Sequence, residues 1–332
     1  MIFYIKEANE FFSQGKYCEA HLIYRKAQDE YPGIKDLFEI NIKICKDMME
    51  RDRKNSAVGD EIFITMTTIK SRLYKLLPVI ESLHKQTLLP KKIYLNLSEA
   101  PYLLDEGVKK EDPYLKKLLD YPLLEINWTE NIGPYRKIVP FLNNFFNQKN
   151  DNKKEIVFIT VDDDTLYPDY FVDTLYKKYI EHDCVVAFRG RYITATDRCI
   201  APYRDWELGK ETPSVNNLPT GKDGILYSTK FFNMDFVDMN AATMLAPTAD
   251  DLWIKWHCGL NGVKALIINP EAATSDYKSF PLVDYSGDYR DNSLYKVHNA
   301  DSSGSKNDES IAKMENYFSK KSIGNLYSLL EK

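Results

Sequence analysis

The chain has 332 residues, 44% of them hydrophobic and 28% charged, which is enough for one large α/β domain with a small appendage. Its 44 basic and 49 acidic residues give a net charge of −5, so electrostatics offer no reason to expect nucleic acid as a partner. No apolar run approaches the ~20 residues of a membrane helix, and the charged, helix-patterned N-terminus does not resemble a signal peptide, so we expect neither feature.

Residues 1–55 have the pattern of a tetratricopeptide-like helical segment, with a third helix expected over roughly residues 34–50. In such a unit, small side chains let two antiparallel helices approach closely, and the recurring positions here are Ala8, Phe11, Gly15, Tyr17, Ala20, Tyr24, Ala27 and Pro32. One unit cannot bury its own face, so the segment should pack on the rest of the chain or on a protein partner. A helical cap without a binding role is the alternative.

After a charged linker, the pattern changes to strands alternating with helices. Strands are predicted over residues 62–67, 92–97, 123–128 and 156–161, and helices over residues 73–83 and 138–146. This alternation predicts a doubly wound α/β sheet. Because ligands bind at the carboxyl ends of the strands in such sheets, the loops after Thr67, Leu97, Trp128 and Val161 should hold the chemistry.

The cysteines and the glycosylation triplets both indicate a cytoplasmic protein. The five cysteines form neither a CxxC pair nor a Cys/His ligand spacing, which argues against a structural zinc site and against a disulfide framework. Two Asn-x-Ser/Thr triplets, at Asn96 and Asn127, fall in or beside predicted strands, where a glycan would interfere with folding.

The strongest chemical signal is a run of three carboxylates, Asp162, Asp163 and Asp164, directly after the apolar strand at 156–161. Adjacent carboxylates repel one another, and a divalent cation or hydrogen-bond donors must offset the repulsion. Oxygen ligands suit Mg²⁺ or Mn²⁺, and either ion could bridge the diphosphate of a nucleotide sugar. The alternative is an acidic turn that caps a helix over residues 168–180.

Five segments in order resemble glycosyltransferases of the GT-A fold, and in particular glycosyltransferase family 2. They are residues 65–72 with 82–87, residues 131–140, the DXD-like segment 158–164, residues 221–227 and residues 249–253. The resemblance covers residues 61 to about 270. It implies a Rossmann-like, doubly wound mixed sheet over residues 60–285, with residues 286–332 forming a C-terminal loop and helices that pack on it.

The same resemblance implies positions for the nucleotide-sugar donor. The loop from Thr67 to Arg72 and the strand end at Asn96 would hold the nucleobase and ribose, although the family often has an acidic residue near the latter position. Asp162 and Asp163 would lie towards the ribose. Lys137 and the preceding Arg136 begin a helix and are placed to meet phosphate, because a helix N-terminus favours anions. A solvated basic turn is the alternative.

The metal would be bound by Asp164 and His298. Asp164 corresponds to the direct ligand of the DXD segment. His298 lies where some GT-A enzymes bring a C-terminal histidine to the metal. A lone histidine is more often a surface or structural residue, which is the alternative for His298.

Asp251 is the candidate catalytic base, because residues 249–251 resemble the acidic motif that precedes a helix in inverting members of the fold. A carboxylate there could take the proton of an acceptor hydroxyl as that hydroxyl attacks the anomeric carbon. The alternative is helix capping, and Asp250 is expected to cap. For the acceptor, we expect Trp206 and Trp253 to stack on sugar faces, and the glycine loop at Gly224 to approach the sugar closely.

The sequence therefore predicts a metal-dependent hexosyltransferase that is inverting and uses a nucleotide sugar, with UDP as the expected nucleotide. The resemblance alone implies the acceptor, a glycan or lipid-linked hydroxyl in bacterial surface polysaccharide synthesis, with peripheral association at the inner face of the membrane. One alternative is a non-catalytic helical-repeat scaffold that binds nucleotide. The other is a metal-dependent phosphatase, whose register requires threonine or valine where Leu166 stands.

Overall fold

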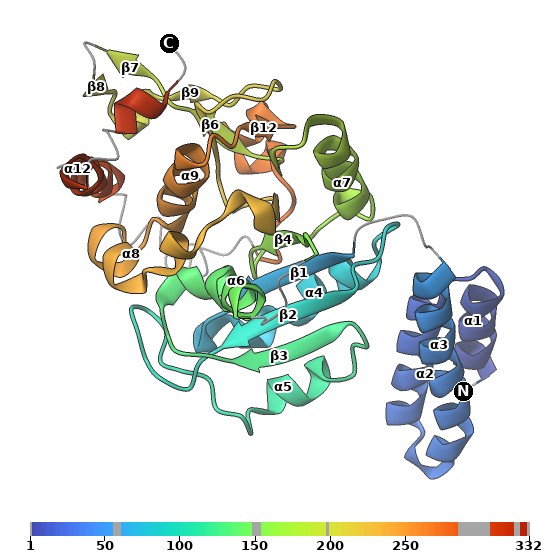
Figure 1. The fold of residues 1–332 in the computed structure, drawn as a ribbon. Coiled ribbons are helices and arrows are strands. Elements are labelled where there is room, and N and C mark those ends of the chain that lie inside the picture. Colours follow the sequence, from blue (N-terminus) through green and yellow to red (C-terminus); the bar gives the residue numbers. More distant parts are fainter. Residues whose placement is uncertain are drawn as a thin grey trace.

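The computed structural model describes residues 2–55, 61–147, 154–196, 199–284, 306–321 and 326–330. The N-terminal segment consists of helices α1 (Ile2–Ser13), α2 (Tyr17–Glu30) and α3 (Lys35–Asn55), with a 3-10 turn η1 (Pro32–Ile34) before α3 (Figure 1). Ala8, Ala20 and Ala27 are completely buried between these helices, as small contact residues should be. The predicted helical segment is confirmed, and its tetratricopeptide character stays a prediction.

Helix α2 joins this segment to the α/β domain. Nε2 of His21 donates to the carbonyl oxygen of Asp120 at 3.1 Å, and Arg25 forms an ion pair with the Asp120 carboxylate. Leu22 packs against the core of the α/β domain. The helices thus bury part of one face on the rest of the chain.

The central sheet has seven strands in the order β12-β5-β11-β4-β1-β2-β3. Their bounds are β1 (Ile62–Thr67), β2 (Lys92–Leu97), β3 (Leu124–Trp128), β4 (Val157–Val161), β5 (Val185–Ala187), β11 (Ile225–Ser228) and β12 (Ala265–Ile267). Strand β11 runs antiparallel to β4 and β5, and the other pairs are parallel. The prediction of a doubly wound mixed α/β sheet preceded by a helical segment is confirmed.

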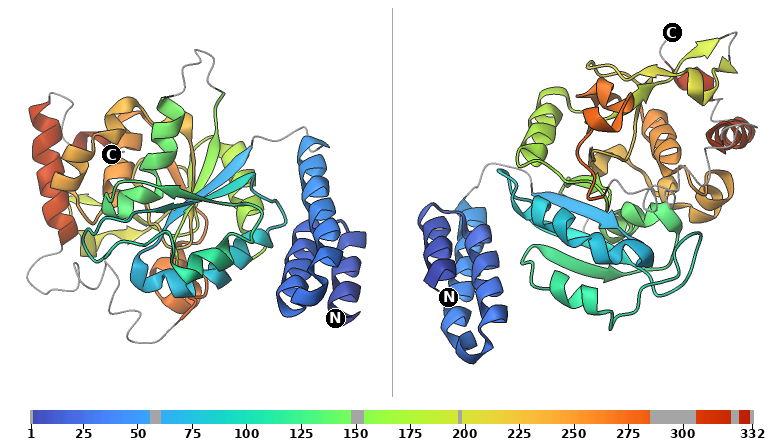
Figure 2. Two further views of the ribbon diagram at one scale, coloured as in Figure 1. Left: turned by 90° about the horizontal axis from the view of Figure 1, so that it is seen from below. Right: turned by 180° about the vertical axis from the view of Figure 1, so that it is seen from behind.

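Helices cover both faces of the sheet. The elements of the first half are η2 (Lys70–Lys75), α4 (Leu77–His84), α5 (Pro113–Leu118), η3 (Gly133–Lys137), α6 (Val139–Phe146) and α7 (Phe171–His182). Figure 2 shows α4 and α5 on one face and α6 on the other. The helix predicted over residues 73–83 starts later, at Leu77, because Pro78 lacks an N–H and is tolerated only in a first turn.

The second half adds smaller elements around the sheet. A three-stranded sheet contains β6 (Gly190–Tyr192), β9 (Glu207–Leu208) and β10 (Asn217–Pro219), and β7 (Ala195–Thr196) pairs with β8 (Cys199–Ile200). The helices are α8 (Met239–Leu245), α9 (Asp250–Leu260) and α12 (Lys306–Lys320), with 3-10 turns η4 (Tyr203–Asp205), η5 (Thr229–Phe231), η6 (Met234–Val237), η7 (Pro270–Ala273), η8 (Asp276–Lys278) and η9 (Leu326–Leu329). Within the described ranges, no helix is both long and apolar enough to cross a membrane.

Strand β4 fixes the position of the acidic run. All five of its residues are buried, between β1 on one side and β11 on the other. The apolar side chains hold the strand inside the sheet, so Asp162 is the first residue to leave it, at the carboxyl edge. The same edge receives the ends of β1 and β2, as the sequence predicts.

Candidate active site

A cavity of about 580 Å³ lies at the carboxyl ends of β1 and β4, between the central sheet and the smaller elements of the second half. Seven of the predicted site residues line it: Thr67, Arg72, Lys137, Asp162, Asp163, Asp164 and Asp251. The topology therefore brings the loop after β1, the acidic run after β4 and the start of α9 to one place.

Two of the three adjacent carboxylates are neutralised by close cations. Oδ1 of Asp162 lies 2.7 Å from Nζ of Lys137. Oδ1 of Asp163 lies 2.9 Å from Arg72, and its Oδ2 accepts a hydrogen bond of 2.6 Å from the Thr68 hydroxyl. Arg72 and Thr68 come from the loop after β1, which explains why that loop and the acidic run must meet.

Asp164 is the least satisfied of the three. Its carboxylate is 3.5 Å from Arg72 and 3.3 Å from the Thr165 hydroxyl, both near the limit of a hydrogen bond. Burial, followed by the charges of Asp163 and Asp162, raises the pKa of Asp164 to about 7. A carboxylate without a close counter-charge suits a hard divalent cation such as Mg²⁺ or Mn²⁺.

The described residues supply only part of a metal site. Across the described ranges, no three His, Cys, Asp or Glu side chains are grouped so that they could hold a metal ion. The second predicted ligand, His298, lies outside the described residues. Among the described residues Asp164 is thus a single candidate ligand, and the metal stays a prediction.

Asp251 faces the same cavity from the first turn of α9. Its Oδ2 accepts a hydrogen bond of 3.0 Å from the backbone N–H of Gly221. Burial, followed by the charge of the neighbouring Asp250, raises the pKa of Asp251 to about 7. A carboxyl group with such a pKa can exchange protons near neutral pH, which is what a general base requires.

Asp250 does not cap α9, contrary to our expectation. The residue at the N-cap position is Ala249, which has no side chain that can cap, and Asp250 is already the first helical residue. Oδ2 of Asp250 is buried without a hydrogen-bond partner and lies 3.7 Å from Nζ of Lys137. Asp250 is thus part of the charge cluster of the cavity.

Lys137 links the acidic run to the start of α9. Burial lowers the pKa of Lys137, but the charges of Asp162, Asp250 and Asp251 more than offset burial and raise the pKa overall. Gly221 lies against this cluster, since a Cβ there would be 2.9 Å from Nζ of Lys137 and 3.5 Å from Oδ1 of both Asp162 and Asp251. Lys137 is therefore engaged by carboxylates, and any phosphate would have to share it with them.

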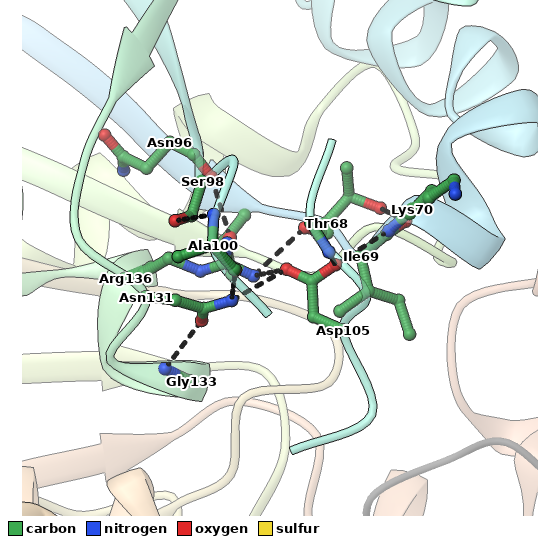
Figure 3. A network of polar contacts seen from close by, with 12 residues as sticks. Thr68, Ile69, Lys70, Asn96, Ser98, Ala100, Asp105, Asn131, Gly133 and Arg136 are labelled. Carbon is green, nitrogen blue, oxygen red and sulfur yellow. Dashed lines mark hydrogen bonds and ion pairs between the residues drawn. The ribbon is translucent and has the colours of Figure 1, made fainter. Parts of the chain in front are cut away.

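Asp105, an acid outside both the acidic run and α9, contacts several of the loops beside the cavity (Figure 3). Its carboxylate lies 2.8 Å from Arg136 and accepts hydrogen bonds from the backbone N–H of Lys70 at 3.1 Å and from the Asn131 amide at 3.2 Å. Arg136 is only 1% exposed, so it is a buried partner of Asp105 rather than a residue at a solvated turn. Both line the cavity.

Sequence reasoning missed Asp105. The resemblance called for an acid near the end of the second strand, where Asn96 stands. Asp105 follows β2 by several residues and returns to the cavity through the loop. The family's preference for an acid there is the only sequence signal that could have indicated Asp105.

Four of the predicted binding residues do not line the cavity, and these predictions are corrected. Asn96 is completely buried and its amide donates to Oγ1 of Thr65 at 3.0 Å, so it braces β1 and β2. The backbone carbonyl oxygen of Asn96 accepts a hydrogen bond of 2.8 Å from the Thr67 hydroxyl. Asn96 thus supports Thr67 from within the sheet.

The other three corrections concern the acceptor. Trp206 is 3% exposed and donates from Nε1 to the carbonyl of Ala201, and Trp253 is 1% exposed and donates to the carbonyl of Phe236. Gly224 has φ of +84°, and a Cβ there would lie 2.4 Å from the ring of Phe171, so it serves the turn before β11. None of the three lines the cavity, whereas Tyr203, whose ring packs on Trp206, does.

No model of a known protein family matches the sequence, and the search of curated proteins finds no significant match. Among solved structures, S. aureus TarS 1–349 is 16% identical over 62% of this chain and 58% of that chain, with a TM-score of 0.37. GalNAc-T7 with UDP, GalNAc and Mn²⁺ is 12% identical over 64% of this chain and 42% of that chain, with a TM-score of 0.38. The chain thus matches less than two thirds of either structure, and similarity at this level does not bear on activity.

Proposed function

We propose that this chain is a metal-dependent glycosyltransferase that moves a sugar from a UDP-sugar to a hydroxyl of a glycan or lipid-linked acceptor, with inversion. One observation carries the proposal: the acidic run after β4 and Asp251 at the start of α9 face one cavity and are joined through Lys137 and Gly221. The acidic run is thus available for the donor, and Asp251 is available for the acceptor.

Asp164 would hold the divalent cation, whose charge would offset that of the departing diphosphate. Arg72 and Thr68 fix Asp163, and Lys137 fixes Asp162, so the acidic run is held rigid around Asp164. The charges of Lys137 and Arg72 would reduce the repulsion between these two carboxylates and the diphosphate. The carboxylate of Asp164 would then supply the oxygen ligand to the metal.

Asp251 would act on the acceptor. Its Oδ2 is occupied by the Gly221 N–H, which leaves Oδ1 to receive the proton of the acceptor hydroxyl. The oxygen of the acceptor hydroxyl forms the new bond to the anomeric carbon while the bond to the diphosphate breaks on the opposite side. The configuration is inverted, and the proton ends on Asp251.

The biological setting of the proposal rests only on the resemblance to glycosyltransferase family 2. We place the acceptor in bacterial surface polysaccharide synthesis, at the cytoplasmic face of the membrane. A panel of nucleotide sugars, screened by thermal shift with Mn²⁺, would identify the donor. Binding without any transfer would instead support the scaffold alternative.

Calorimetry of UDP tests the metal-dependent donor site. We expect UDP to bind wild-type protein with Mn²⁺ and to lose most of its affinity in EDTA or in the Asp164→Ala variant. Asp169→Ala is the matched control, because Asp169 is an exposed acid of the same segment and does not line the cavity. Undiminished affinity in EDTA would rule out the metal, and product with retained anomeric configuration by NMR would rule out inversion.

A further inference from the structure

Two arginines that line the cavity form no ion pair with a described acid. Six basic side chains line it: Arg72, Arg136, Lys137, Arg189, Arg191 and Lys222. Four of them form ion pairs of 2.7 to 2.9 Å. Arg72 pairs with Asp163, Arg136 with Asp105, Lys137 with Asp162 and Lys222 with Asp276. Over the ranges that the structure describes, neither Arg189 nor Arg191 forms an ion pair.

Neutral groups hold the two arginines in place. Arg189 donates from Nε to the carbonyl of Ala272 at 3.2 Å and from NH1 to Oγ1 of Thr220 at 3.4 Å. Arg191 donates from NH2 to the carbonyl of Ala273 at 3.2 Å. The positions of the two guanidinium groups are thus fixed by η7, while their charges remain uncompensated by these contacts.

The carboxylate of Asp223 is already engaged elsewhere. Burial raises the pKa of Asp223, and the charge of Arg189 is among the weaker effects that lower it. The Asp223 carboxylate accepts hydrogen bonds from the Ser279 hydroxyl at 2.6 and 2.7 Å and from the Phe280 N–H at 3.1 Å. Its hydrogen bonds thus go to residues 279 and 280, and Asp223 does not line the cavity.

Arg189 is linked to the candidate base through Thr220 and Gly221, and both arginines come from other elements than the acidic run. Thr220, which Arg189 contacts, is followed by Gly221, whose N–H binds Asp251. Arg189 lies between β5 and β6 and Arg191 lies within β6, whereas the acidic run follows β4. An acceptor hydroxyl placed at Asp251 would therefore bring the neighbouring part of the acceptor towards Arg189, and Arg191 lines the same cavity.

We infer that the acceptor carries an anionic oxygen group, a phosphate or a carboxylate, which Arg189 and Arg191 bind beside the reacting hydroxyl. The inference rests on the proposed function and adds the chemical class of the acceptor. Guanidinium groups bind both anions through paired N–H donors, and a partly buried cation gains from an anionic ligand that replaces its lost hydration. The inference also explains why two arginines that form no ion pair with a described acid line a cavity that holds several aspartates.

Ligand-observed NMR titrations with glucose 6-phosphate, glucuronate and glucose test this inference. Each is added to protein saturated with UDP and Mn²⁺, so that the donor site is filled. We expect at least one of the two anionic sugars to bind at least about tenfold more tightly than glucose, and their relative affinity distinguishes phosphate from carboxylate. The double variant Arg189→Gln/Arg191→Gln should lose this preference while its affinity for UDP stays the same.

Arg204→Gln is the matched control, because the Arg204 side chain is 84% exposed and lies outside the cavity. If the double variant does not fold, Arg191→Gln alone gives the test, since it removes only one hydrogen bond to a carbonyl. An equal affinity of the wild-type protein for all three sugars would overturn the inference, as would an unchanged preference in the variant. Displacement of UDP by glucose 6-phosphate would also overturn it, because the phosphate would then occupy the donor site.

The two proposals fail in different ways. If wild-type protein does not bind UDP in the calorimetric experiment, the proposed donor chemistry is wrong. If UDP binds normally and the anionic sugars show no preference that depends on Arg189 and Arg191, only the inference about the acceptor is wrong.

Discussion

Asp251 can be separated from its neighbour by substitution, because the two acids have different partners. Asp251 binds the Gly221 N–H, whereas Asp250 lies beside Lys137. Asp251→Asn keeps the shape and removes the base, so turnover should fall by about 10² to 10⁴ while donor affinity changes little. Initial rates and a UDP titration measure both quantities. An equal loss of turnover in Asp250→Asn would show that the total charge of the cluster matters rather than a base at Asp251.

The raised pKa of Asp251 predicts opposite effects of pH on stability and on rate. Its pKa is about 7 in the folded state and 3.8 as its ordinary value. Between these values the folded state binds the proton more tightly, so the contribution of Asp251 to the free energy of unfolding falls as pH rises towards 7. Transfer needs the deprotonated form, so the rate should rise over the same interval.

Urea unfolding and rate measurements between pH 5 and 8 check both trends. Asp251→Asn cannot titrate and should flatten this part of the stability profile. Measuring stability with and without Mn²⁺ separates the contribution of Asp164, which has a similar pKa and which the metal would keep ionised. A rate that is highest at pH 5 would contradict a carboxylate base.

Local sequence context determined which site residues could be predicted. The acidic run follows a fully apolar strand, so its place at the carboxyl edge could be read from the sequence. The tryptophans could not be placed in this way, because an indole N–H satisfied by a backbone carbonyl leaves no trace in the sequence. Arg189 and Arg191 belong to no motif, and only tertiary packing brings them to the cavity.

At the scale of elements, long apolar runs were predicted well and short ones were not. β1 and β2 have the predicted bounds, and β3 and β4 start one residue later than predicted. Residues 221–227 were interpreted as a loop, yet β11 begins at Ile225, because pairing with β4 and β5 stabilises a strand of only four residues. The two-residue and three-residue strands of the second half carry too little periodicity to be recognised.

Two glycines of the turn before β11 should respond differently to alanine. At Gly224, φ is +84° and a Cβ would lie 2.4 Å from the Phe171 ring, so Gly224→Ala should destabilise the protein by roughly 1–3 kcal/mol. At Gly221, the nearest contact of a Cβ is the far end of the Lys137 side chain, at 2.9 Å, rather than a ring or backbone. Gly221→Ala should therefore cost little stability and should reduce transfer, because the methyl group enters the space between Asp162 and Asp251.

Thermal melts and transfer rates of both variants give the comparison, and each variant is the control for the other. A large loss of stability in Gly221→Ala, with Gly224→Ala unaffected, would contradict the placement of this turn.

At the scale of the whole molecule, the N-terminal helices and the cavity are structurally separate. Every described residue that lines the cavity lies at position 67 or later, whereas α1 to α3 end at Asn55. Removal of residues 1–55 should therefore leave UDP affinity within about twofold. It should lower the melting temperature by a few degrees, about 2–4 °C for each kcal/mol lost, because the contact of α2 with Asp120 disappears.

Asp120→Ala in the full chain is the control for this truncation. It removes only the ion pair with Arg25, whose side chain is 31% exposed, so it should cost at most about 1 kcal/mol. Loss of UDP binding in a truncated protein that still melts cooperatively would show that the helices take part in the donor site.

The backbone of the acidic run is itself hydrogen-bonded to a distant segment, and amide hydrogen exchange can report on that pairing. Val283 donates to the carbonyl of Asp164 and Leu166 donates to the carbonyl of Pro281, each at 2.8 Å, beside the bridge between Thr165 and Leu282. These amides exchange with deuterium only when the pairing opens. UDP with Mn²⁺ should slow exchange at Leu166 and Val283 and leave exchange at Asp183, at the end of α7, unchanged. The exchange rates of two amides would thus report the occupancy of the donor site.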